Sequence, residues 1–174
     1  RILVAHSNGS LLALRMLADP ARPIEVDAAV ISSPFLGLRL EVPAIKRGAA
    51  RVLSRIWPTL AMANELKVEQ LTHDVAMQRA RTADTLCNDV ATARWFTEAQ
   101  AAQAYVAANA ARIAVPTLWT IGGDDPIADP AVSARIAASV PAAEIHVLPG
   151  YAHEVFNEVD RAKVFEMVQT FVRA

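Results

Sequence analysis

The sequence predicts an α/β domain in which a parallel sheet is flanked by helices. Short apolar runs bounded by turn residues occur at 27–32, 116–121 and 144–148, as expected of buried parallel strands. Helix-forming stretches alternate with these runs, which favours right-handed crossovers between parallel strands. A third observation is the length of 174 residues, which suits one domain with a substantial core.

Turn-forming and helix-ending residues mark the bounds of the N-terminal elements. Ile2-Leu3-Val4 has the composition of the last part of a buried strand, and a helix-forming stretch runs from about residue 8 to residue 18. Asp19-Pro20 ends this helix because proline cannot continue it. The strand at 27–32 is next, and Ser33-Pro34 closes it. We therefore expect a strand, a helix and a second strand within residues 1–34.

The C-terminal elements have clear start signals. Asp129 is suited to cap a helix whose first residue is Pro130 and which extends to about Ser139. The strand at 144–148 is followed by a loop and then by a closing helix over 160–172. One face of that helix is apolar, with Val164, Phe165, Val168, Phe171 and Val172. Residues 114–174 thus complete the predicted core.

The segment between these two parts, residues 35–113, has a helical pattern throughout and no strand signal. Apolar residues recur at helical spacing in its first half, at Ile45, Ala49, Val52, Leu53 and Ile56. A second long helix is expected at about 91–111. We therefore predict that 35–113 forms a helical cap inserted into a core made of 1–34 and 114–174.

Ala5-His6-Ser7-Asn8-Gly9 joins the first strand to the first helix. A serine in a sharp strand-to-helix turn is the arrangement of a nucleophile elbow. The strained turn requires small residues two positions before and after the serine, and Ala5 and Gly9 meet this need. The N-terminus of the following helix directs partial positive charge at the turn. Ser7 is the predicted nucleophile.

Two partners for Ser7 follow later strands. Asp125 comes after the strand at 116–121, and His153 lies in the loop after the last strand. The carboxyl ends of parallel strands meet at one edge of a sheet, so the three side chains are expected together. Asp124 is an alternative to Asp125, because the preceding Gly-Gly turn leaves the phase of the strand open. Asp129 is better explained as a helix cap.

The other histidines give no metal-ligand pattern. We expect His6 to point away from Ser7 and to pack, His146 lies in a predicted strand, and His73 has no visible partner. Scattered histidines and one cysteine, Cys87, exclude a recognisable zinc spacing and an intramolecular disulfide. No metal or cofactor is therefore expected, and the single cysteine fits a reducing, cytoplasmic compartment.

Composition limits the classes of partner. The net charge is −1 with Lys and Arg scattered, so no nucleic-acid partner is expected. No apolar run approaches the ~18 residues of a membrane span. The mean hydropathy of +0.25 is high for a globular chain, which indicates an apolar ligand or a covered surface.

Several segments together carry a family resemblance: the elbow, 31–34, Thr92-Ala93-Arg94-Trp95-Phe96-Thr97-Glu98, Gly122-Gly123-Asp124-Asp125 and 151–158. With them the chain resembles the monoacylglycerol lipase and lysophospholipase-like branch of the serine α/β-hydrolases. The resemblance covers the whole chain but only the C-terminal two-thirds or so of such a protein. The N-terminal part, with the His-Gly loop that supplies a second oxyanion N–H, is absent from this sequence.

The resemblance implies a catalytic set and a reaction. Ser7 matches the nucleophile, Asp125 the acid and His153 the base, and the backbone N–H of Asn8 matches one oxyanion donor. The implied activity is hydrolysis of a carboxylic ester, of monoacylglycerol or lysophospholipid type, through an acyl-enzyme. Alternatives are a carboxylesterase, thioesterase, acyltransferase or aminopeptidase, a binding module, or an inactive fragment that needs its N-terminal half.

Two further contacts are expected. The apolar cap suits an acyl chain and, at its outer surface, peripheral contact with a membrane. The elbow strand, with no strand before it in this sequence, would be an exposed apolar edge open to self-association.

Overall fold

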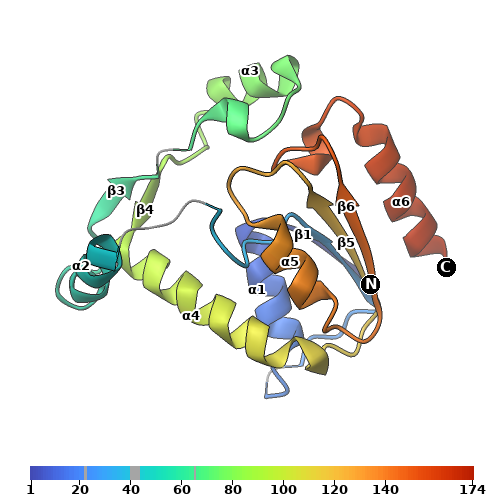
Figure 1. Ribbon diagram of the computed structural model, residues 1–174, viewed down its shortest axis with the longest axis horizontal. Helices are drawn as coiled ribbons and strands as arrows, with labels where there is room; N and C mark the ends of the chain where they lie inside the picture. Colours follow the sequence, from blue (N-terminus) through green and yellow to red (C-terminus); the bar gives the residue numbers. More distant parts are fainter. Residues whose placement is uncertain (22, 40–43, 65) are drawn as a thin grey trace.

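The main sheet is parallel throughout. The computed structural model describes residues 1–21, 23–39, 44–64 and 66–174. Its main sheet has the order β1-β2-β5-β6, with β1 (Ile2–His6), β2 (Ala28–Ser32), β5 (Thr117–Gly122) and β6 (Ala143–Leu148). The predicted α/β class with a parallel sheet is confirmed (Figure 1).

Helices cover both faces of this sheet. The α-helices are α1 (Asn8–Leu17), α2 (Ala44–Ile56), α3 (Val75–Ala83), α4 (Ala93–Asn109), α5 (Pro130–Ala137) and α6 (Arg161–Arg173). Short 3₁₀ turns are η1 (Val68–Gln70), η2 (Ala110–Arg112) and η3 (Val155–Asn157). None of the helices in the described ranges is long and apolar enough to cross a membrane.

Successive side chains of each strand point to opposite faces of the sheet, so the core has two layers, one on each face. Ala5, Ile31, Trp119 and Ile145 occupy one row across the four strands and face α1, α4 and α5, where the larger hydrophobic cluster lies. On the opposite face α6 packs over a smaller cluster that includes Leu148, Val155 and Val164. Figure 1 shows α6 on one side of the sheet and the other three helices on the other. The sheet is thus packed on both of its faces.

β1 is the edge of the sheet beside the site. Within the described residues it pairs only with β2. Val4 shares a row with Val30 and Leu118, which are fully buried, yet Val4 itself is 56% exposed. On this face of the sheet, side chains of β1 are therefore less buried than those of β2 and β5.

The insertion contains two strands, so the prediction of a purely helical 35–113 is wrong. β3 (Ala61–Ala63) and β4 (Val90–Thr92) form a small antiparallel ribbon. Three-residue strands are too short to show a period of two, and alanine, which makes up two-thirds of β3, is not a strand former. Thr92 then caps α4 by accepting a hydrogen bond from the N–H of Trp95.

α4 belongs partly to the core. Val106 and Ala110 are buried in the larger cluster together with the residues of α1. In Figure 1, α2, β3, β4 and α3 stand away from the sheet, whereas the C-terminal half of α4 runs along it. The division of the chain at residues 35 and 113 into core and cap stays a prediction.

The apolar stripe of α2 faces solvent. Ile45 is 86% exposed, and Val52 and Ile56 are exposed as well. The buried side of the helix carries Ala50 and Ser54, and the hydroxyl of Ser54 lies 2.7 Å from that of Thr97 on α4. The helical spacing predicted the helix correctly, but none of the described residues covers its most apolar face.

Candidate active site

The backbone of Ser7 is strained and firmly held. Its φ of 51° and ψ of −119° lie where side-chain-bearing residues are rare. The N–H of Ser7 donates to the carbonyl of Ser32, and its carbonyl accepts from the N–H groups of Leu11 and Phe35. These three bonds fix the turn between β1 and α1, which sets the Ser7 hydroxyl at the carboxyl edge of the sheet.

The two glycines near this turn, Gly9 and Gly122, differ in the room that a side chain would have. A Cβ added at Gly9 would meet nothing within 4 Å among the described residues, so the expected steric need for a small residue has no counterpart there. The tight position is Gly122 at the end of β5, where a Cβ would overlap the carbonyl oxygen of Ala152. Gly122 is therefore required for the loop that carries His153 to approach β5.

His153 connects Ser7 to Asp125. Its Nε2 lies 2.8 Å from Ser7 Oγ, and its Nδ1 lies 2.7 Å from Asp125 Oδ2. A carboxylate only accepts hydrogen bonds, so Nδ1 carries the proton and the unprotonated Nε2 accepts from the Ser7 hydroxyl. His153 is 4% exposed and Asp125 is 1% exposed. The imidazole is thus held in the tautomer that a general base needs.

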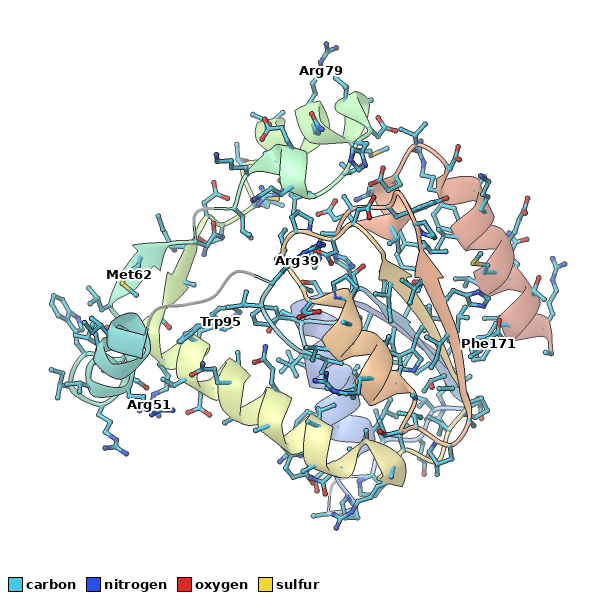
Figure 2. All side chains as sticks on the ribbon, viewed as in Figure 1. Arg39, Arg51, Met62, Arg79, Trp95 and Phe171 are labelled. Atoms are coloured by element: carbon cyan, nitrogen blue, oxygen red, sulfur yellow. The ribbon has the colours of Figure 1, made fainter. Side chains whose placement is uncertain are left out.

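Asp125 is itself fixed from several sides. Its Oδ1 accepts hydrogen bonds from the N–H groups of Ile127 and Ala128, at 2.8 and 3.0 Å. Its carbonyl accepts from Arg39, whose side chain reaches in from the chain after β2 (Figure 2). The neighbouring Asp124 is exposed. The structure therefore brings Asp125, and not Asp124, to His153.

The remaining predicted acid and the oxyanion donor have defined places. Asp129 caps α5 by accepting from the N–H groups of Ala131 and Val132, as expected. Asn8 is the first residue of α1, so its N–H has no partner within the helix. Its role as oxyanion donor stays a prediction.

His6 lies against His153, which the sequence did not indicate. Its ring centroid is 4.9 Å from that of His153, and its Nδ1 lies 3.1 Å from Ser32 Oγ. Burial, together with the nearby His153, lowers the pKa of His6 to about 4 against the opposing effects of Asp125 and Ser32. His6 is therefore neutral at neutral pH.

A polar row continues from His6 across the sheet. Ser32, Thr120 and His146 occupy the same register position on the three following strands. The Thr120 hydroxyl is buried and, within the part of the chain the structure describes, has no hydrogen-bond partner. His146 at the far end pairs with Glu144 at 2.7 Å. At the near end of this row, His6 lies against His153, and the carbonyl of Ser32 accepts the N–H of Ser7.

The hydroxyl of Ser7 opens into a cavity of about 630 Å³. Its polar lining includes Ser7, Asn8 and His153, and most of its wall comes from Phe35, Leu38, Ala50, Met62, Leu66, Val90, Trp95, Phe96 and Ile127. Trp95 stacks on Phe35 with ring centroids 5.8 Å apart. Figure 2 shows Trp95 pointing from the start of α4 toward the main sheet. Met62 lies on strand β3, away from that sheet. None of the described lining residues is acidic.

Metal ligation has no candidate in the described ranges. No group of three or more His, Cys, Asp or Glu side chains there is placed to hold an ion.

The comparison with known protein families gives one match that spans most of the chain. The family described as serine aminopeptidase, S33, matches residues 1–160. Phospholipase YtpA of Bacillus subtilis is 27% identical over 172 residues, which is 97% of this chain and 66% of that protein. Monoacylglycerol lipase of Mycolicibacterium smegmatis is 27% identical over 176 residues, or 99% of this chain and 61% of the relative. The chain thus spans less than two-thirds of these curated relatives.

The fold comparison points the same way. The crystal structure of the monoacylglycerol lipase of Paleococcus ferrophilus has a TM-score of 0.89 and 27% identity, covering 99% of this chain and 68% of that one. A soluble variant of the monoglyceride lipase of Saccharomyces cerevisiae, 22% identical, shares the fold with a TM-score of 0.80 over 98% of this chain and 60% of its own. With the family match over residues 1–160, the chain belongs to the serine aminopeptidase S33 family of α/β-hydrolases.

Proposed function

We propose that this protein is a serine hydrolase that cleaves carboxylic esters of medium or long acyl chains, of the monoacylglycerol or lysophospholipid kind. One observation carries the proposal: the hydrogen-bonded series Ser7–His153–Asp125 opens directly into a cavity with apolar walls. The names of two relatives, a phospholipase and a monoacylglycerol lipase, support this substrate class.

The reaction follows from the hydrogen bonds. Nε2 of His153 takes the proton of Ser7 Oγ as the oxygen attacks the ester carbonyl. The resulting imidazolium is stabilised by Asp125, and the oxyanion lies next to the N–H of Asn8. His153 then protonates the departing alcohol, which leaves an acyl group on Ser7. Water, deprotonated by His153, releases the acid and restores the serine.

The cavity wall favours an ester over a peptide substrate. An aminopeptidase binds a substrate ammonium group, and an ammonium buried without a carboxylate partner is strongly disfavoured. The described residues around the cavity offer amide, hydroxyl and imidazole groups but no carboxylate. An uncharged acyl chain fits the mainly apolar wall that the described residues form.

Ser7→Ala in the intact protein is the direct test. We expect hydrolysis of monoacylglycerol and of p-nitrophenyl esters to fall by at least about 10³-fold, because the nucleophile is lost. Labelling by a fluorophosphonate should disappear in parallel. Ser139→Ala, at an exposed serine of the same chain, is the control and should change neither readout.

Two results would contradict the proposal. Ester cleavage by Ser7→Ala at the wild-type rate would exclude Ser7 as nucleophile. Cleavage of an amino-acid p-nitroanilide faster than of monoacylglycerol, by the wild-type protein, would exclude the substrate class in favour of an aminopeptidase.

A further inference from the structure

Glu158, after η3, is a buried carboxylate outside the triad. It is 3% exposed, and its two oxygens accept four hydrogen bonds. Oε1 accepts from the N–H of Ala152 at 2.8 Å and from His73 Nδ1 at 2.9 Å. Oε2 accepts from the N–H of His73 at 3.1 Å and from that of Val159 at 3.4 Å. A carboxylate buried to this degree is stable only while such donors stay in place.

On one side, Glu158 holds the peptide that precedes the base. Ala152 is the residue before His153, and its N–H is bound by Glu158 Oε1. Its carbonyl oxygen lies so close to Gly122 that no side chain would fit there. Ala152 is therefore clamped from both directions, and the direction in which the chain enters His153 is set by this clamp.

On the other side, Glu158 binds the insertion. His73 lies in segment 71–74, between η1 and α3. Both its backbone N–H and its imidazole Nδ1 donate to Glu158. Three more hydrogen bonds join the same two stretches of chain: Glu154 N–H to the Leu71 carbonyl, the Thr72 hydroxyl to the Asn157 carbonyl, and Arg161 to Asp74. In Figure 1 the start of α3 accordingly lies beside the chain that leads into α6.

We propose that Glu158 is a positioning residue that couples the placement of segment 71–74 to the placement of His153. The inference rests on the proposed function, since it assumes that His153 is the base. When segment 71–74 is docked, both Glu158 oxygens are satisfied and Ala152 is clamped. When the segment moves away, Glu158 loses both His73 donors and turns toward water, which releases the Ala152 N–H. The Ser7–His153 hydrogen bond then lengthens and the nucleophile is less activated.

Glu158→Gln tests the coupling in the intact protein. The amide nitrogen of glutamine cannot accept a hydrogen bond. The N–H groups that bond one of the two Glu158 oxygens would therefore face another donor. We expect kcat for a short, soluble p-nitrophenyl ester to fall by about 10- to 100-fold, because misplacement of a catalytic group by about 1 Å costs about that much. KM should change less than about twofold, since Glu158 does not line the cavity. The rate of fluorophosphonate labelling should fall with kcat.

Glu154→Gln is the matched control. Glu154 is a carboxylate of the same loop whose side chain accepts a hydrogen bond from Asn157, and no hydrogen bond among the described residues joins that side chain to Ala152 or to segment 71–74. We expect its kcat, KM and labelling rate to stay within about twofold of wild type. A loss of kcat in this variant equal to that of Glu158→Gln would overturn the proposal, because any charge change in the loop would then suffice.

His73→Ala tests the insertion side and remains informative if Glu158→Gln does not fold. It removes the imidazole donor and keeps the backbone donors, so kcat and labelling should fall less than in Glu158→Gln. The double variant should be no slower than Glu158→Gln alone, because coupled residues are not additive. Wild-type kcat in His73→Ala, or full additivity in the double variant, would overturn the coupling.

The two proposals fail in different ways. Absence of fluorophosphonate labelling in the wild-type protein would contradict the proposed function itself. Normal labelling of the wild type together with a wild-type rate in Glu158→Gln would leave the proposed function intact and overturn only the role of Glu158.

Discussion

His6 serves the site by staying uncharged. Its burial against Ser32 and the ring of His153 keeps the pKa of His6 near 4, so it carries no positive charge at neutral pH. In the proposed acylation step His153 becomes an imidazolium, and a second cation 4.9 Å away would oppose that step. A neutral imidazole supplies packing and one hydrogen bond without this penalty.

The depressed pKa makes stability depend on pH. In the unfolded chain His6 titrates near 6.5, whereas in the folded protein it titrates at about 4. Between these values the unfolded state binds more protons, so the stability due to a neutral His6 is complete above pH 6.5 and is lost as the pH falls toward 4. The loss amounts to about 3 kcal/mol at most.

Urea unfolding of wild type and His6→Gln between pH 4 and pH 7 measures this loss. We expect the stability of the wild type relative to the variant to decrease steadily as the pH is lowered, because glutamine does not titrate. A difference between the two that is the same at every pH would show that His6 does not titrate in this way.

Among the elements, α2 has an exposed apolar face that no described residue covers. Ile45, Val52 and Ile56 lie on it, and Trp57 follows directly. Exposed Arg51, labelled in Figure 2, gives the helix a basic flank. A helix with an apolar stripe and basic flanks suits an interface with anionic lipid. We propose that α2 brings the protein to the surface of a membrane, where acyl esters are found.

Vesicle sedimentation tests the role of α2. Binding to vesicles that contain phosphatidylglycerol should weaken by about tenfold or more in the double variant Ile56→Ser and Trp57→Ser, because buried apolar area is lost. Leu86→Ser, at an exposed leucine outside α2, is the control and should bind as wild type. Equal weakening in both variants would show that the contact is not specific to α2.

The same elements show what the sequence could predict. The strands and helices of the core have strong local signals: buried apolar runs, the Asp129-Pro130 start and the Asp19-Pro20 stop. The three-residue strands β3 and β4 have none. The exposed side of α2 could not be inferred either, because periodicity identifies an apolar face but not whether anything covers it.

For the site, the order of Ser7, Asp125 and His153 along the chain predicted their meeting, because parallel strands bring their carboxyl ends together. Whether Asp124 or Asp125 faces His153 depends on how the chain turns after Gly122-Gly123. That turn is fixed only in the folded loop. The pairing of His73 with Glu158 joins residues 85 apart through two loops. Loop conformation has no periodic signal, so this contact had no counterpart in the sequence.

At the scale of the whole molecule, the sheet has two edges of different character. β6 carries the charged Glu144 and the polar His146, whereas β1 before His6 is entirely apolar. Charged residues on edge strands oppose pairing with another chain. We therefore expect residues 1–174 expressed alone to self-associate through β1.

Size-exclusion chromatography with light scattering measures the association. Val4→Lys should shift residues 1–174 toward the monomer, because a charge then projects from the edge strand. Val147→Lys, on the opposite edge strand, is the control and should leave the mass unchanged. A monomeric wild-type chain at the same concentration would contradict the expectation.

The topology also has a consequence for when the site exists. Ser7 and His153 are 146 residues apart, and the β2–β5 pairing that brings them together closes a loop that contains the whole insertion. Contacts of such long range form slowly and late in folding. Ser7 leaves the ribosome before His153, so the nascent chain carries Ser7 without this hydrogen-bond partner until the segment with His153 has been made and has folded.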